Sequence, residues 1–119
     1  MREFVKACKA LSDETRLRIL RLLMERDCCV YEVMQALEIS QTRASRNLSA
    51  LYDAGFLKLS RNGARCRYSI DRGGVKRYSV DLLEAVDKAL QANETALLDK
   101  QRLESAAKSV QRRMDGLSS

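Results

Sequence analysis

The sequence predicts a mainly helical fold with one small β-hairpin. Proline is absent and only five of the 119 residues are glycine, so few residues interrupt helices. Apolar residues recur every three or four positions over most of the chain, which is the period of an amphipathic helix. The period changes to two only after Gly55, where an Asn-Gly pair separates two short β-type runs. Such a pair is a hairpin signal.

Two helices are predicted at the N-terminal end. Apolar residues at helical spacing predict a first helix that ends near Ser12: Phe4, Val5, Cys8 and Leu11. Ser12 or Asp13 can cap the second helix, because a side-chain oxygen there can accept a bond from a free N–H group. The second helix is apolar over more than half its circumference, through Leu17, Ile19, Leu20, Leu22, Leu23 and Met24. We therefore expect it to be the central helix of the core.

Residues 30–57 predict two short helices joined by a tight turn. The first has an apolar face made of Val30, Val33, Met34 and Leu37. The connector Glu38-Ile39-Ser40 is too short for anything but a sharp reversal, and Ser40 is a good N-cap for the helix that follows. That following helix has an apolar stripe made of Ala44, Leu48, Leu51 and Tyr52.

The outward start of this following helix carries the residue types that read a DNA major groove. The groove admits one α-helix, and its base edges are read by Arg, Asn, Gln, Ser and Thr. The candidate residues are Gln41, Thr42, Arg43, Ser45, Arg46 and Asn47. An ordinary amphipathic helix with a solvated polar face is the alternative, and periodicity alone does not separate the two.

The charge distribution favours nucleic-acid binding. The chain has a net charge of +6, and all of the excess lies in its middle third. Residues 40–77 hold nine basic and two acidic side chains, whereas residues 1–39 are neutral and residues 80–119 have a net charge of −1. A basic segment that begins at a helix-turn-helix is typical of a nucleic-acid binder, because neutralising phosphates releases counterions.

The hairpin resembles the wing of a winged helix-turn-helix. Gly55 can end the preceding helix in a left-handed conformation, and two β-type runs follow on either side of Asn62-Gly63. Arg61, Arg65 and Arg67 can place cations against the DNA backbone or in the minor groove. A surface hairpin made soluble by its arginines is the alternative.

After the break at Gly73-Gly74, the sequence predicts one long helix. Residues 76 to 113 contain neither glycine nor proline, and apolar positions step by three and four through Leu83, Val86, Leu90, Asn93 and Leu97. So long a stripe predicts packing against a symmetry mate, with Asn93 fixing the register. We expect a DNA-binding domain over residues 1–75 and a dimerisation segment over residues 76–119.

Three stretches resemble signatures of the ArsR/SmtB family of metal- and metalloid-sensing repressors. They are KALSDETRLRILRLL at residues 9–23, SQTRASRNLSAL at 40–51 and AGFLKLSRNGARCRYSI at 54–70. The resemblance implies a homodimeric repressor that binds double-stranded operator DNA and releases it when an inducer binds. No enzymatic activity is expected, because the chain has no histidine to act as a base, no C-x-x-C motif and no Gly-rich phosphate loop.

The cysteines depart from the family pattern. Many family sensors carry Glu-Leu-Cys-Val-Cys-Asp-Leu where this chain has Asp-Cys-Cys-Val-Tyr-Glu-Val at residues 27–33, so Cys29 matches the first motif cysteine and Tyr31 replaces the second. Arsenite and antimonite favour three thiolates, and a helix start is expected to lower the pKa of Cys28 and Cys29. Cys8 or Cys66, of either subunit, is the candidate third ligand. As(III), Sb(III) or another thiophilic metal ion is thus the expected inducer, rather than a permanent cofactor.

Other interpretations remain open for the thiols. Cys8 can be a core residue and Cys66 a strand filler. The same repressor can sense oxidants or reactive sulfur by joining two cysteines, or it can bind DNA with no inducer. Without histidine there is no imidazole zinc site and no obvious catalytic base. With no apolar run of roughly 18 residues, we expect a cytoplasmic protein without a membrane partner.

Overall fold

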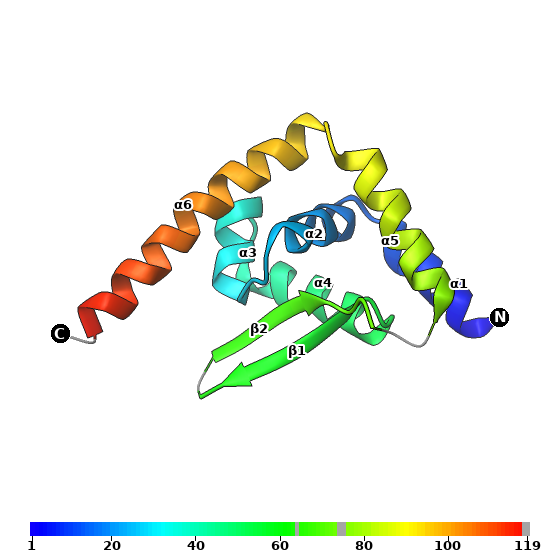
Figure 1. The fold of residues 1–119 in the computed structure, drawn as a ribbon, viewed down its shortest axis with the longest axis horizontal. Helices are drawn as coiled ribbons and strands as arrows, with labels where there is room; N and C mark the ends of the chain where they lie inside the picture. The colour runs from blue at the N-terminus through cyan, green and yellow to red at the C-terminus, as the bar shows by residue number, and fades with distance from the viewer. Residues whose placement is uncertain (64, 74–75, 118–119) are drawn as a thin grey trace.

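The chain folds into six helices and one hairpin within the part that the computed structural model describes, which is residues 1–63, 65–73 and 76–117, with side chains through residue 109. In chain order the elements are α1 (Arg2–Leu11), α2 (Glu14–Glu25), α3 (Val30–Leu37), α4 (Gln41–Asp53), β1 (Leu57–Asn62), β2 (Arg65–Ile70), α5 (Arg77–Leu90) and α6 (Glu94–Leu117). Figure 1 shows α5 and α6 as an arch over α2 and α3, with the hairpin on the opposite side. The predicted mainly helical fold is confirmed.

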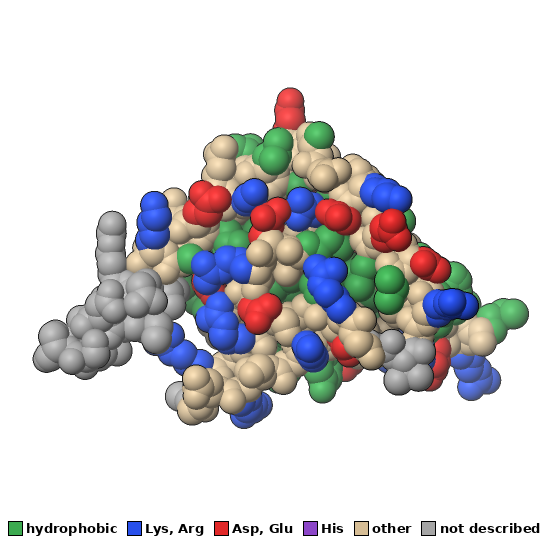
Figure 2. Space-filling model, viewed as in Figure 1, with side chains coloured by type: hydrophobic (Ala, Val, Ile, Leu, Met, Phe, Trp, Pro, Cys, Tyr) green, Lys and Arg blue, Asp and Glu red, His purple; other side chains and the backbone are tan. Residues whose placement is uncertain are grey.

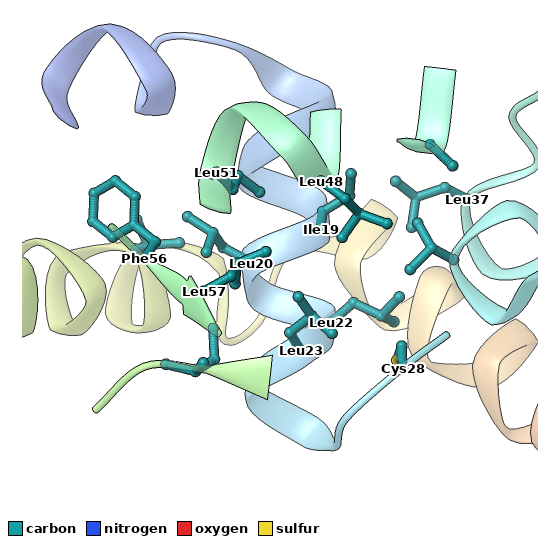
Figure 3. Packing of buried hydrophobic residues seen from close by; sticks show 14 of the residues in the cluster. Ile19, Leu20, Leu22, Leu23, Cys28, Leu37, Leu48, Leu51, Phe56 and Leu57 are labelled. Carbon is teal, nitrogen blue, oxygen red and sulfur yellow. The ribbon is translucent and has the colours of Figure 1, made fainter. Parts of the chain in front are cut away.

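Helix α2 is the centre of the hydrophobic core, as predicted. Ile19 and Leu20 are fully buried, and they lie among apolar side chains of α3, α4 and the hairpin. Figure 3 shows Leu48 and Leu51 of α4 and Phe56 beside this helix. Full burial of a leucine or isoleucine side chain stabilises the fold by about 1.5–3 kcal/mol. This core fixes α4 relative to the rest of the chain.

Both predicted helix caps are confirmed. The Asp13 side chain accepts a hydrogen bond from the Arg16 N–H at 3.0 Å and begins α2. The Ser40 hydroxyl accepts one from the Arg43 N–H at 3.2 Å and begins α4. Gly55 follows the end of α4 with φ +90°, the left-handed conformation expected there, which glycine adopts without steric cost.

The buried face of α1 is made of other residues than the sequence predicts. Ala7 and Ala10 are its buried residues, whereas Cys8 is exposed. Phe4 lies partly exposed against Tyr78 of α5, with ring centroids 5.1 Å apart. The interpretation of Cys8 as a core residue is therefore wrong, because the small alanine side chains form the contact face of this helix.

The predicted hairpin is confirmed, with an antiparallel register that runs from Leu57 opposite Ile70 to Asn62 opposite Arg65. Leu57 and Ile70 are buried at its base. Gly63 has φ +66° at the tip, as a primed turn requires. The hairpin extends away from the helices (Figure 1), which gives it the position of a wing.

The prediction of a single long helix after residue 76 is wrong. The chain turns between α5 and α6, and the Asn93 side-chain oxygen accepts a hydrogen bond from the Ala96 N–H at 3.1 Å at the start of α6. Asn93 therefore acts as a helix cap rather than as a register residue. Basic and acidic side chains are interspersed over α5 and the described part of α6 (Figure 2).

Helix α6 packs on α2 and α3 of its own chain. Leu103 is 1% exposed and Ala106 is 5% exposed on this helix. Leu83 and Val86 of α5 are buried as well, so part of the apolar stripe expected to meet a symmetry mate is covered within the chain. Asp99, only 1% exposed, accepts hydrogen bonds from the Arg18 guanidinium at 2.8 and 3.0 Å. Docking of α6 thus depends on apolar contacts and a buried ion pair.

The Arg18 and Arg102 guanidinium groups also reach the end of α3. Arg18 donates to the carbonyl of Leu37 and Arg102 to that of Ala36, each at 3.3 Å. These are carbonyls of the last helical turn, which lack partners within the helix. The same two guanidinium groups therefore donate hydrogen bonds both to the carbonyls at the end of α3 and to the Asp99 carboxylate.

The expected domain boundary at residue 75 lies outside the described residues, and so does Gly74 of the predicted break. Contacts of α5 and α6 with α2 and α3 join the two expected parts of the chain. No helix in the described ranges combines the length and the apolar character needed to cross a membrane.

Candidate nucleic-acid interface and thiol cluster

A tight turn places α4 at the surface. Helix α3 ends at Leu37, and Glu38 adopts a left-handed conformation with φ 56° that reverses the chain. The Ile39 N–H donates to the Met34 carbonyl at 3.2 Å, and Ser40 then caps α4. The predicted helix-turn-helix is confirmed in its local geometry.

Helix α4 has one buried and one exposed face. Ala44, Leu48 and Leu51 are fully buried as predicted, but Tyr52 is 47% exposed and does not belong to the core stripe. The exposed or half-buried polar residues are Gln41, Thr42, Arg43, Ser45, Arg46, Asn47 and Ser49. The chain thus presents hydrogen-bonding side chains over the first two turns of this helix.

Two of the predicted DNA-reading side chains are bonded to α2. Arg43 Nη2 donates to the Thr15 hydroxyl at 3.0 Å. The Asn47 oxygen accepts from Arg16 Nη1 at 3.3 Å, and its nitrogen donates to the Arg43 carbonyl at 2.8 Å. These bonds hold the two helices together and give Arg43 and Asn47 a structural role beside any contact with DNA.

Ser49 is an exposed residue that the sequence prediction missed. It lies three positions after Arg46 and seven after Thr42, so the three residues share one face of α4. The same helical spacing that identified the buried stripe could have identified this residue. The outward face therefore extends one turn further than predicted.

The three wing arginines lie in two different places. Arg61 and Arg65 are exposed on the strands next to the tip of the hairpin. Arg67 is instead directed to the start of α3, where its Nη2 donates to the Asp27 carbonyl at 2.8 Å and to Glu32 Oε1 at 3.2 Å. The cations at the wing tip are thus Arg61 and Arg65, whereas Arg67 fastens the wing to the helical body.

Glu32 is a fully buried carboxylate at the start of α3. Its Oε1 accepts the Cys29 N–H at 3.1 Å and the Arg67 guanidinium, while its Oε2 accepts Arg26 Nη2 at 3.0 Å. A buried carboxylate needs partners of this kind, because isolated charge is strongly disfavoured in the interior. We call Arg26, Cys29, Glu32 and Arg67 the Glu32 cluster.

Cys28 is completely buried and belongs to the hydrophobic core (Figure 3). Its thiol lies 3.5 Å from the Arg26 carbonyl, to which it can donate. Its backbone pairs with that of Tyr68 in β2 through two hydrogen bonds of 3.0 and 2.8 Å. The segment before α3 therefore extends the wing by one short bridge.

The expected lowering of the thiol pKa is wrong for both adjacent cysteines. Burial raises the pKa of Cys28 to about 12, and the nearby Glu32 carboxylate adds to the effect. Burial also raises the pKa of Cys29, the N-cap of α3. The helix start does not produce a thiolate here, because low solvent exposure and a neighbouring carboxylate both favour the neutral thiol.

The four candidate thiols do not form one site within a protomer. Cys8 is exposed on α1, Cys66 is half-buried on β2, and the adjacent pair precedes α3. Among the described residues, no group of three or more His, Cys, Asp or Glu side chains is arranged to hold a metal ion. Three thiolates around one ion therefore require a second subunit or a rearrangement of the segment before α3.

Comparison with known sequences identifies relatives among bacterial regulators. A family model for bacterial regulatory proteins of the arsR family matches residues 13–58. The arsenic resistance transcriptional regulator ArsR1 of Pseudomonas putida is 41% identical over 63 residues, covering 52% of this chain and 49% of that protein. The uncharacterized HTH-type transcriptional regulator YbzH of Bacillus subtilis is 32% identical, over 61% of this chain and 88% of that protein. The chain spans between 49% and 63% of the length of the first curated relatives that it matches.

Comparison with solved structures gives the same fold. The homodimeric winged helix-turn-helix DNA-binding domain of Mb0332 from Mycobacterium bovis, described as a possible ArsR-family transcriptional regulator, superposes with a TM-score of 0.62 at 28% identity. The match covers 77% of this chain and 82% of that one. The winged helix-turn-helix predicted from the sequence is confirmed.

Proposed function

The chain belongs to the ArsR family of bacterial transcriptional regulators, and from this membership we propose that it is a homodimeric repressor of operator DNA with a cysteine-based inducer site. The family consists of DNA-binding regulators rather than enzymes. A cytoplasmic location follows from this proposal, because the operator lies there.

The outward face of α4 is the observation that carries the DNA-binding proposal. Thr42, Ser45, Arg46 and Ser49 share an exposed or half-buried face with no apolar side chain among them. An arginine on such a helix can donate two hydrogen bonds to a guanine in the major groove. Two copies of this helix in a homodimer would read a palindromic site, and the homodimeric relative from Mycobacterium bovis supports that arrangement.

The wing supplies the second part of the proposed interface. Arg61 and Arg65 project cations from the hairpin, and the middle third of the chain holds nine basic and two acidic side chains. Such charge gives affinity for the phosphate backbone without reading sequence. The α4 face would select the operator while the wing tips strengthen binding to any duplex.

We expect Arg61→Ala to weaken binding to operator and unrelated DNA by the same factor. The reason is that a phosphate contact is lost, so the slope of log K against log salt should fall by about 1 for each wing. Fluorescence anisotropy on both duplexes at several salt concentrations measures this. If the loss were confined to the operator, the wing would be reading bases.

The proposed inducer is arsenite, antimonite or another thiophilic metal ion, bound through Cys29 and Cys28. Cys29 is half-buried and caps α3, so its thiol lies at the surface end of the pair. Relatives that are named as arsenic, cadmium and mercury resistance regulators support this class of inducer. Cys66 or Cys8, of either subunit, would complete a three-thiol site.

Cys29→Ser should abolish release by arsenite while leaving operator binding in place. Serine is also an N-cap residue, so this substitution removes the soft ligand and keeps the start of α3. The measurement is anisotropy of the reduced protein on a labelled fragment of its own promoter, titrated with arsenite. Cys8→Ser removes an exposed thiol and tests whether Cys8 is the third ligand, because release by arsenite is then lost as in Cys29→Ser.

Sensing of oxidants or reactive sulfur is the second candidate, and the absence of a three-thiol group within the described part of one protomer favours it. Two thiols would give two electrons and two protons to a peroxide, forming one disulfide and two waters. Release by peroxide, reversed by dithiothreitol, in a protein that ignores arsenite would select this candidate. A protein that ignores both reagents would be a constitutive DNA-binding protein.

A further inference from the structure

The start of α3 and the wing are joined by three separate contacts. The Cys28 and Tyr68 backbones form two hydrogen bonds, Arg67 donates to the Asp27 carbonyl, and Arg67 also donates to Glu32. The thiols therefore lie in the segment to which strand β2 is attached. A conformational change at the thiols would therefore directly alter the contacts that hold the wing.

Glu32 connects this attachment to Cys29 in particular. A single oxygen, Oε1, accepts both the Cys29 N–H at 3.1 Å and the Arg67 guanidinium at 3.2 Å. Any movement that withdraws Cys29 from its capping position removes one of these bonds and shifts the carboxylate that holds Arg67. Because the carboxylate is fully buried, water cannot simply replace the lost partner.

We propose that Glu32 and Arg67 are the positioning residues that transmit the state of the Cys29 thiol to the wing. The inference rests on the proposed function and adds the means by which the thiol site regulates DNA binding. In the tight-binding state the Glu32 cluster is intact and β2 is held against the start of α3. In the induced state the cluster is broken and the wing is no longer fixed in its DNA-binding position.

The chemistry of arsenite binding explains why the cluster must open. Each thiol that binds arsenous acid replaces one hydroxyl group, its proton leaving with that group as water. The Cys28 thiol is buried in the core. Cys28 lies in a β-bridge and Cys29 has an extended backbone, and successive side chains of an extended chain point to opposite sides. For Cys28 to join Cys29 on one arsenic atom, the segment before α3 must therefore rearrange. Rearrangement breaks the backbone pairing of Cys28 with Tyr68.

The test compares the arsenite response of wild-type protein and Glu32→Gln. The ratio of operator dissociation constants with and without saturating arsenite is measured by anisotropy for each. We expect a ratio of about tenfold or more for wild type and roughly 1 to 2 for Glu32→Gln, which should already bind the operator more weakly without arsenite. A residue with a purely structural role would lower both affinities equally and leave the ratio unchanged.

Three further variants make the result specific. Arg67→Gln, at a partly exposed position, should lower the ratio in the same way and serves if Glu32→Gln fails to fold. Glu84→Gln is the matched control, because Glu84 pairs with Lys88 within α5, and its ratio should equal that of wild type. Cys29→Ser should remove the response entirely.

Hydrogen exchange provides a readout that does not depend on DNA. Arsenite should accelerate exchange of the Tyr68 amide, whose partner is the Cys28 carbonyl. An unchanged Tyr68 amide, or a wild-type ratio in both Glu32→Gln and Arg67→Gln, would overturn the inference while leaving the thiol sensor in place. A wild-type protein that responds to neither arsenite nor peroxide would overturn both the sensor and the inference.

Discussion

Replacing Arg46 by alanine should abolish selective binding to the operator. Arg46 is exposed in the middle of the outward face of α4, between Thr42 and Ser49. One bidentate arginine contact to a base contributes about 1–3 kcal/mol of discrimination. A homodimer loses the contact at both half-sites, so the affinity should fall by about 2–6 kcal/mol, or roughly 30-fold to 10⁴-fold. Anisotropy on the operator measures the loss.

Lys108→Ala is the matched control for that experiment. It also removes one positive charge from each protomer, but from an exposed position on α6. Its effect should be confined to a small change in non-selective affinity. Equal affinities of Arg46→Ala and wild type for the operator would show that α4 is not the recognition helix.

Replacing Asp99 by asparagine should strongly destabilise the fold. The substitution keeps the shape of the side chain but leaves Arg18 without its anionic partner in a site where the Asp99 side chain is 1% exposed and Arg18 is 21% exposed. Breaking a buried ion pair from one side costs about 3–5 kcal/mol, and the partial exposure of Arg18 favours the lower end. At fixed protein concentration, the melting temperature should fall by about 10 °C.

Glu84→Gln provides the comparison for the buried pair. Glu84 pairs with Lys88 at 3.0 Å, but the two side chains are 58% and 73% exposed. An ion pair at such a position contributes about 0–1 kcal/mol, so this variant should melt close to wild type. If Asp99→Asn had the same melting temperature as Glu84→Gln, the docking of α6 would depend on apolar contacts alone.

Local signals explain why the sequence predicts most of the winged helix-turn-helix. Asp13 and Ser40 cap helices through residues three positions away, and Gly63 forms a turn within its own hairpin. Such features need no knowledge of distant parts of the chain. The exposed start of α4 follows from the same periodicity that locates its buried stripe.

Features that depend on distant residues could not be predicted in this way. The charge and position of Arg67 in the sequence are those of a wing residue that contacts DNA. In the structure its guanidinium instead binds the Glu32 carboxylate, 35 positions earlier. The thiol pKa values depend on burial, which the helix-start argument does not include. Asn93 satisfies two local rules at once, since it continues an apolar spacing and also caps a helix, and only packing of α6 on α3 decides between them.

The pairing of Arg18 with Asp99 has a consequence for the nascent chain. The two residues are 81 positions apart, and contacts of such long sequence separation form late because a large loop must close first. Translation proceeds at about 5–20 residues per second. Several seconds therefore pass between synthesis of the helix-turn-helix and synthesis of the helix that clamps it. A ribosome-bound chain would therefore carry α3 and α4 before it carries α6, which packs on α2 and α3.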